Sequence, residues 1–334
     1  MSATVKPEKK HFSVLLNELI SIISPLYGGT FIDCTFGQGG LSKKILENLT
    51  NKVIAIDRDK KTIVNAIKFK EKYKDRFFFK NIKFSEINNA NLDNENVKAI
   101  IFDLGYSMSQ ILDPEKGLSF DSKGKLNMQL GLNEFSAHDV INNLEKKDLE
   151  KIFRYFGEEK NAKIISKKVC ESRKKSYIDT QNLVDIINKA NFRRKSKIHH
   201  ATKIFQSLRI FVNKEISELI FGLINAFKIL PIGGMLIVIS FHSIEDRIVK
   251  SFLRFFSENK NSSRYLPNFQ QNKKLFKLIN RKPILPSKEE IELNNPSRSA
   301  KLRYAVKINH EQNFNEFIGI FKNLLEIESL SEKL

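Results

Sequence analysis

Short apolar runs alternate with amphipathic stretches along the first third of the chain. The runs have the length of buried strands, and the stretches between them repeat their apolar residues at helical spacing. Strands are predicted at 31–33, 53–57, 77–80 and 99–103, and helices at 14–26 and 60–73. Alternation of this kind predicts a sheet with parallel strands and right-handed helical connections.

The pattern changes after about residue 136. From 136 to 192 the apolar positions keep a helical period, and no strand pattern interrupts them. A strand pattern returns at 234–240, and a last strand is predicted over 300–308. We therefore predict an α/β fold in which a helical insertion divides a sheet domain. The expected boundaries are 1–130 for the first part of the sheet domain, 131–212 for the insertion and 213–334 for the second part.

A glycine-rich loop follows the first predicted strand. Gly37, Gly39 and Gly40 carry no Cβ, so the backbone can turn sharply there and approach a ligand closely. Asp57, at the end of the second strand, is placed to accept hydrogen bonds from ribose hydroxyls. The pattern favours an adenosine-containing cofactor, although Ser42 stands where the dinucleotide fingerprint has its third glycine. The alternative is a plain glycine turn between a strand and a helix.

The charge of the chain indicates a polyanionic partner. Its 334 residues include 57 Lys and Arg against 38 Asp and Glu, a net charge of +19. Within 160–215, fifteen basic residues face four acidic ones, and the densest run is 193–197. This concentration favours RNA or DNA, because each contact with a phosphate adds affinity. The alternative for any single run is a solvated helical face.

The cysteines and the apolar runs bound the class of protein. The chain has two cysteines, Cys34 and Cys170, which are too few for a disulfide framework. They do not have the Cys-x-x-Cys spacing of a zinc site, and we expect both to be buried packing residues. No metal site is predicted. The N-terminal ten residues carry no signal-peptide pattern, and no apolar run has the length of a membrane span. We expect a cytoplasmic protein that does not contact a membrane.

Seven segments, in order, resemble the bacterial 16S rRNA (cytosine-N4)-methyltransferase family. The resemblance runs from about residue 11 to residue 303. The segments are His11–Leu16, Asp33–Gly40, Asp103–Ser107 with Gln110 and Asp113, Tyr155–Glu159, Ala201–Ile210, Ser240–Lys250 and Asn295–Arg303. The resemblance implies a Rossmann-like class I S-adenosylmethionine methyltransferase sheet whose helical insertion recognises RNA. The implied substrate is a decoding-centre cytosine of 16S rRNA in the small ribosomal subunit, methylated on its exocyclic N4.

The same resemblance implies roles for individual residues. Asp103 and Ser107 are the implied catalytic residues. The implied S-adenosylmethionine-binding residues are Gly37, Gly39, Gly40, Leu41, Asp57, Phe84, Asp103 and Gln110. Gly39, Gly40 and Leu41 would line the methionine end, and Phe84 would lie near the adenine.

The chain departs from the family pattern at a few positions. The family usually has His where this chain has Leu41, and Pro where it has Ser13. An acidic and basic pair of the family is replaced by Asn127 and Gln129. These changes affect the acceptor side more than cofactor binding.

The chemistry of the reaction asks for hydrogen-bond acceptors near the cytosine amine. The lone pair of that amine is delocalised into the ring, so the enzyme must orient the nitrogen and accept hydrogen bonds from it as it becomes tetrahedral. Asp103, the carbonyls after it and Ser107 would supply acceptors. Tyr106 is a candidate to stack on a flipped base.

His242 has two candidate roles. It would either help to position the base, or belong to a helix start at which Ser243 and Asp246 form the N-cap.

Two other functions stay open at this point. One is a nicotinamide-dependent oxidoreductase, and the other is a non-catalytic RNA-binding protein that keeps the fold. The pattern also leaves open whether the chain is a monomer or a homodimer.

Overall fold

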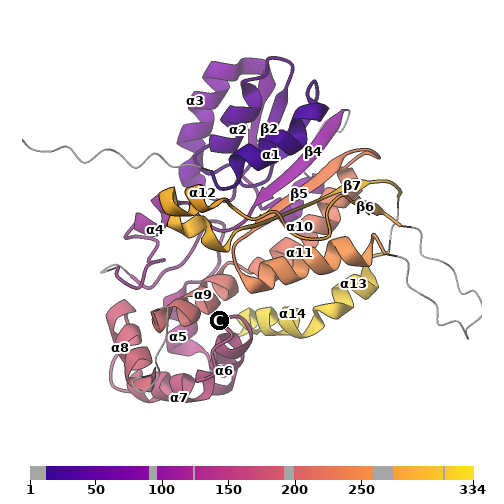
Figure 1. Ribbon diagram of the computed structural model, residues 1–334. Helices are drawn as coiled ribbons and strands as arrows, with labels where there is room; N and C mark the ends of the chain where they lie inside the picture. The colour runs from indigo at the N-terminus through magenta and orange to yellow at the C-terminus, as the bar shows by residue number, and fades with distance from the viewer. Residues whose placement is uncertain (1–12, 90–95, 123–124, 192–198, 259–273, 311–312) are drawn as a thin grey trace, which may run out of the picture.

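The fold is a seven-stranded sheet with helices on both faces and a group of helices below it (Figure 1). It was analysed in a computed structural model that describes residues 13–89, 96–122, 125–191, 199–258, 274–310 and 313–334. The strands are β1 (Thr30–Asp33), β2 (Lys52–Ile56), β3 (Phe77–Lys80), β4 (Val97–Asp103), β5 (Met235–Ser240), β6 (Phe276–Leu278) and β7 (Lys301–Lys307). Their order is β3-β2-β1-β4-β5-β7-β6, with β7 antiparallel to both of its neighbours.

The parallel strands end at one edge of the sheet. β1 pairs with β2 on one side and with β4 on the other, so the segments that follow these three strands emerge together. In this register Asp33 lies opposite Ala55 and Ile101. The three aspartates that the sequence predicted at strand ends, Asp33, Asp57 and Asp103, therefore come to one rim of the sheet.

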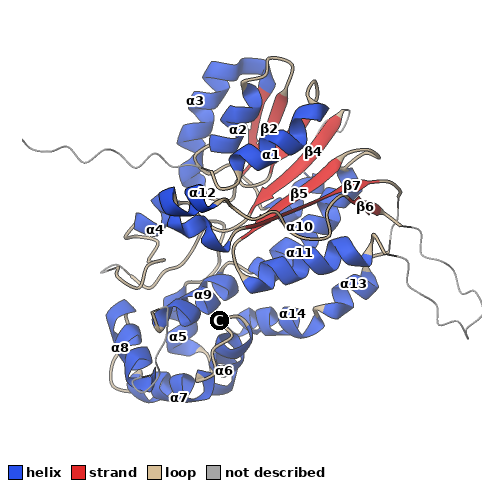
Figure 2. Cartoon of the chain, viewed as in Figure 1, coloured by secondary structure: helices blue, strands red, loops and turns tan. Residues whose placement is uncertain are grey.

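Two layers of helices cover the sheet, because successive residues of each strand face opposite sides (Figure 2). Phe31 packs with α1 (Leu16–Ile23) and α2 (Gly40–Leu46) on one face, where α3 (Ile63–Tyr73) also lies. Ile32 belongs to the opposite core, which includes α10 (Glu215–Ile229) and α11 (Ser243–Phe255). Two short helices, α4 (Met108–Leu112) and α12 (Lys288–Leu293), complete this part.

Five helices form a separate group below the sheet (Figure 1). They are α5 (Ala137–Asn143), α6 (Lys146–Tyr155), α7 (Ala162–Ser172), α8 (Thr180–Asn191) and α9 (Ala201–Val212). The helical insertion predicted from the periodicity is therefore present. Its buried side chains join the core under the sheet in one continuous apolar cluster. The domain boundaries at 130 and 212 stay a prediction.

The end of the chain folds back between the two parts. α13 (Asn315–Ile320) and α14 (Lys322–Glu328) run beneath α11 towards α6 (Figure 1). Phe314, Phe317 and Phe321 are buried there and continue the core.

The sequence patterns missed some features of the fold, and some of the predicted features lie outside the described residues. β6 was not predicted, because three residues in a basic stretch give no readable alternation. Cys34 is buried as expected, whereas Cys170 is only half-buried against the core. The basic run 193–197 and His11 lie outside the described residues. Among the residues that the structure describes, no helix is both long and apolar enough to cross a membrane.

Candidate active site

The glycine loop is held in place by the carboxylate at the end of β2. The amide of Gly37 donates to Oδ2 of Asp57 at 2.7 Å, and Oδ1 of Asp57 accepts from the amide of Asp59 at 2.8 Å. Gly37 and Gly39 have φ of 51° and 79°, a region that favours glycine. A Cβ on Gly40 would come within 2.5 Å of Ser13 Oγ. The loop therefore needs its glycines for both conformation and close approach.

Ser42 has a structural reason to replace the third glycine. Its hydroxyl donates to Oδ2 of Asp33 at 2.6 Å, and both residues are fully buried. Burial raises the pKa of Asp33 to about 6, although the hydrogen bonds from Ser42 and Thr35 oppose this rise. The pair fastens the start of α2 to the end of β1.

Leu41 offers only its backbone to a ligand. Its side chain is buried in the core between the sheet and α1, so it faces away from the loop surface. The departure from the family's histidine thus removes a polar side chain without disturbing the turn. The predicted contact of Leu41 with the cofactor would therefore be made by its backbone.

Asp103 presents an unpaired acceptor at the same rim. Its amide donates to Oγ1 of Thr35 at 2.8 Å, which links the ends of β4 and β1. Its Oδ1 is buried and has no hydrogen-bond partner among the described residues. Burial, together with the nearby carboxyl groups of Asp33 and Glu245, raises the pKa of Asp103 to about 8. A buried acceptor without a donor is costly, so it points to a group that binds there.

Ser107 and Gln110 close the start of α4. The hydroxyl oxygen of Ser107 accepts from the amide of Gln110 at 3.3 Å, and Oε1 of Gln110 accepts from the amide of Ser107 at 2.9 Å. Nε2 of Gln110 donates to Oδ2 of Asp59 at 2.9 Å, and Lys116 pairs with the same oxygen. Both residues therefore shape the loop beside Asp57. Their roles in catalysis and in cofactor binding stay predictions.

Phe84 lies under the sheet, at the start of a short 3-10 helix (Phe84–Asn89). Its ring packs edge-on against Phe102, with centroids 5.2 Å apart, and a Cβ on Gly222 of α10 would come within 2.6 Å of it. Packing with α10 thus fixes this ring. The predicted contact of Phe84 with adenine is not tested by these contacts.

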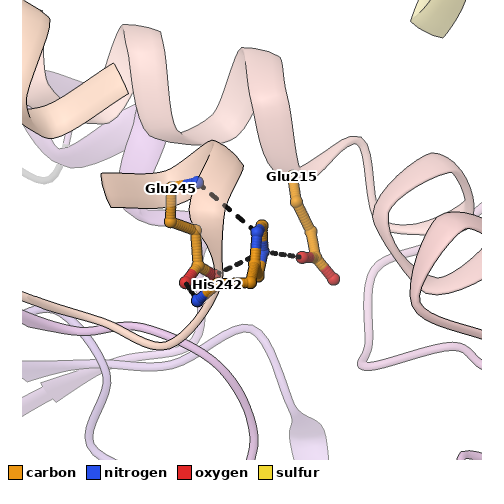
Figure 3. A group of neighbouring side chains, drawn as sticks. All are labelled: Glu215, His242 and Glu245. Atoms are coloured by element: carbon orange, nitrogen blue, oxygen red, sulfur yellow. Dashed lines mark hydrogen bonds and ion pairs between the residues drawn. The ribbon is translucent and has the colours of Figure 1, made fainter. Parts of the chain in front are cut away.

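Four charged side chains form a buried network that the sequence patterns did not reveal. Arg209, at the end of α9, makes two hydrogen bonds of 2.8 Å with the carboxylate of Glu215 at the start of α10. Nε2 of His242 lies 3.8 Å from Glu215 and 3.0 Å from Oε1 of Glu245 (Figure 3). Sequence spacing gave no sign of it, because the partners come from three separate segments.

Attraction within the network opposes the effect of burial on the pKa values of its members. Burial alone would lower the pKa of His242, but the carboxylates of Glu245 and Glu215 raise it to about 9. Burial would raise the pKa of Glu215, but Arg209 and His242 lower it to about 2. Nδ1 of His242 accepts from the amide of Glu245 at 3.4 Å, so the imidazole proton in this geometry lies on Nε2, towards the two carboxylates.

His242 itself, not Ser243, occupies the N-cap of α11. The prediction that Ser243 and Asp246 form the cap was therefore wrong by one position. Glu245 accepts hydrogen bonds from the amides of Phe241 and His242, at 2.8 and 3.3 Å. Asp246 instead pairs with Lys301 and Arg303 of β7. The cap fixes the direction in which His242 enters the network.

The comparison with known proteins decides the family. Residues 8–308 match the MraW methylase family. The chain belongs to this family. It is 42% identical over 305 residues to "Ribosomal RNA small subunit methyltransferase H" of Rickettsia bellii. The alignment covers 90% of this chain and 100% of that protein. It is 37% identical over 308 residues to the protein of the same name from Afipia carboxidovorans, covering 91% and 92%.

The likeness of this methylase to one solved structure is weak. A putative rRNA-methylase from Clostridium thermocellum aligns with 92% of this chain and 100% of its own, at 14% identity and a TM-score of 0.39. A likeness of this size adds nothing to the family match.

The departures near Met128 have a plain structural role in the methylase. Nδ2 of Asn127 donates to the carbonyl of Glu115 at 3.0 Å, and Nε2 of Gln129 donates to the carbonyl of Phe135 at 2.9 Å. The two amides therefore hold the loop after α4 by backbone contacts.

Proposed function

We propose that this methylase transfers a methyl group from S-adenosylmethionine to the exocyclic N4 of cytosine 1402 in 16S rRNA. The observation that carries the proposal is the buried, unpaired Oδ1 of Asp103 at the end of β4, beside the glycine loop and Asp57. The names of the relatives support a substrate in the small ribosomal subunit.

The residues at the rim fit the cofactor. Gly37 and Gly39 adopt positive φ, which lets the loop through Gly40 turn at the rim, and Asp57 offers carboxylate oxygens for ribose hydroxyls. When bound there, S-adenosylmethionine supplies an electrophilic methyl group on a sulfonium. The backbone at Leu41 and the side chains of Phe84 and Gln110 complete the proposed set.

Asp103 supplies the acceptor that the amine needs. In the ionised form its Oδ1 accepts a hydrogen bond from the N4 amino group, which orients the nitrogen lone pair towards the methyl carbon. Gly105, two residues after Asp103, has φ of 101°, so the chain turns there. The reaction needs no covalent nucleophile, and Cys34 is buried with a raised thiol pKa because of its burial and the charge of Asp33.

The helical group supplies a basic surface for the RNA. α7 and the turns beside it carry exposed lysines at 160, 163, 167, 174 and 175. Lysines on one exposed segment can contact successive phosphates, and each contact adds salt-dependent affinity. We place the reaction in the cytoplasm, where ribosomal RNA is available to the enzyme. A monomer and a homodimer are both compatible with this proposal.

The test is methyl transfer to small ribosomal subunits from cells that lack the modification. With labelled S-adenosylmethionine, we expect one N4-methylcytosine in 16S rRNA, located by mass spectrometry. Asp103→Asn should lower the rate by about a hundredfold or more, since it removes an aligned charged acceptor. Asp75→Asn, at an exposed position, is the matched control and should keep the wild-type rate. Cofactor binding without transfer to these subunits would contradict the proposal and favour a non-catalytic RNA-binding role.

A further inference from the structure

Tyr106 occupies an unusual place on the loop after Asp103. It is 41% exposed, whereas Leu104, two residues before it, is buried. The guanidinium of Arg209 lies over its ring, 4.6 Å from the centroid. Arg209 itself is 7% exposed. The ring is therefore supported from beneath by a buried cation and open to the solvent elsewhere.

The support under Tyr106 is rigid. Two 2.8 Å hydrogen bonds to Glu215 fix the plane of the Arg209 guanidinium, since a paired fork has a defined geometry. His242 links Glu215 to Glu245, and Glu245 is anchored on the first turn of α11. The ring of Phe241, next to His242, would lie 3.3 Å from a Cβ on Gly105, so the loop and the network pack directly together.

The network does not resemble a cation site. Glu215, His242 and Glu245 each offer a ligand atom within 4.8 Å of the others. However, both oxygens of Glu215 already bind Arg209, so a metal ion would lie close to a guanidinium charge. The paired Arg209 and Glu215 and the capping contacts of His242 suit a fixed support for a ring better than a binding site for an ion.

We propose that Tyr106 is the stacking platform for the flipped target cytosine, and that Arg209 is a positioning residue that sets the plane of its ring. This inference rests on the proposed function and adds the site for the base. Tyr106 is three residues after Asp103, so the two side chains start within about 10 Å of each other. A base stacked on the ring can thus present its amino group to Oδ1 of Asp103. Base–aromatic stacking tolerates any base, so selection of cytosine falls to the Asp103 side.

The first test is kinetic, on small ribosomal subunits that lack the modification. Tyr106→Ala should lower kcat/KM for subunits about ten- to a hundredfold, mainly through KM, and leave the Kd for S-adenosylmethionine unchanged. Tyr106→Phe keeps the ring and should retain the wild-type rate within about threefold. Arg209→Lys loses the planar fork and should fall between the two.

The matched control is Phe78 on β3. Phe78 is 43% exposed, and Nζ of Lys70 lies 4.7 Å from its ring centroid. It therefore resembles Tyr106 in exposure and in its contact with a cation, but it lies in the edge strand β3. Phe78→Ala should leave kcat and KM for subunits unchanged. A merely structural role for Tyr106 would instead lower the melting temperature and cofactor binding together, with no separate rise in KM.

A second readout uses the absence of tryptophan from the sequence. Tyr106→Trp introduces a single fluorophore at the platform, and Phe78→Trp introduces one at the control position. Protein-free 16S rRNA, added at concentrations where filter binding shows a complex, should quench only the first.

The outcomes separate the two proposals. If the wild type methylates the subunits and Tyr106→Ala does so equally well, the platform is overturned and the function stands. Unquenched fluorescence of Tyr106→Trp in the bound complex overturns it as well. If the wild type does not methylate the subunits, the function fails and the platform falls with it.

Discussion

Three aspartates at the ends of adjacent strands share one rim but differ in their partners. Asp33 accepts from Ser42, and Asp57 accepts from Gly37 and Asp59. Burial raises the pKa of each to about 6. Asp103 lacks a donor at Oδ1, and its pKa is raised further, to about 8. The least satisfied of the three is thus the one that a substrate amine would approach.

This difference predicts a pH dependence for activity. We propose that the ionised form of Asp103 is the acceptor, so kcat/KM for S-adenosylmethionine should rise with pH through about 8, the pKa of Asp103 in the free enzyme. The profile of Asp103→Asn should lack this limb. A wild-type profile that is already flat between pH 6 and pH 9 would contradict the assignment.

The raised pKa of Asp103 also makes the free energy of unfolding depend on pH. The pKa of Asp103 is raised above its usual 3.8, so its contribution to stability is complete below about pH 3.8 and is lost as the pH rises through 8. The melting temperature of Asp103→Asn should therefore fall less than that of the wild type between pH 6 and pH 9.

At the scale of elements, local patterns predicted the sheet rim but not the network beside it. An apolar run followed by an aspartate identifies a strand end from adjacent residues, as at Asp57. Arg209 and Glu215 pair across a break between two helices, where Lys214 adopts φ of 50°, and His242 joins them from a segment that follows β5. Pairing of this kind depends on packing between elements, which no local spacing records.

The start of α10 depends on a residue from the end of the chain. The carboxylate of Glu328, in α14, accepts from the amides of Ile216 and Ser217 at 2.7 and 2.9 Å. These are free amides of the first turn, and the residue before them is Glu215. The family match ends at residue 308, so this cap comes from outside it. α14 therefore stabilises the start of α10, which carries Glu215, the partner of Arg209.

We predict that Glu328→Gln weakens this cap. A glutamine has one acceptor oxygen for two buried amides, so the free energy of unfolding should fall by about 1–3 kcal/mol. Glu326→Gln, on the same helix and exposed, is the control and should change it by less than about 0.5 kcal/mol. Urea unfolding measures both, and equal values for the two variants would show that the cap contributes nothing.

At the scale of the whole molecule, the sheet and the helical group share one core, and an ion pair joins the C-terminal segment to the helical group. Nζ of Lys333 lies 2.6 Å from Oδ2 of Asp148, whose side chain is 1% exposed, on α6. Glu328 binds α10 under the sheet, so the last twenty or so residues contact both parts. This arrangement opposes free rotation of the helical group relative to the rim.

Removing the lysine tests this link. Lys333→Met leaves Asp148 buried without its partner and should lower the free energy of unfolding by about 1–3 kcal/mol. Lys322→Met removes an exposed lysine whose pair with Glu326 is 3.8 Å long, and should have little effect. If calorimetry gives both variants the wild-type melting temperature, the link is not a stabilising one.

The strand order has a consequence for how the chain emerges from the ribosome. β7 lies between β5 and β6 although it is synthesised after both, so β5 has an open edge until residues 301–307 leave the exit tunnel. The core under the sheet is completed later than the sheet itself, because it includes Phe317 and Phe321. During translation the nascent chain therefore exposes apolar surface until residues 301–321 have emerged, a period in which chaperone binding would protect it from aggregation.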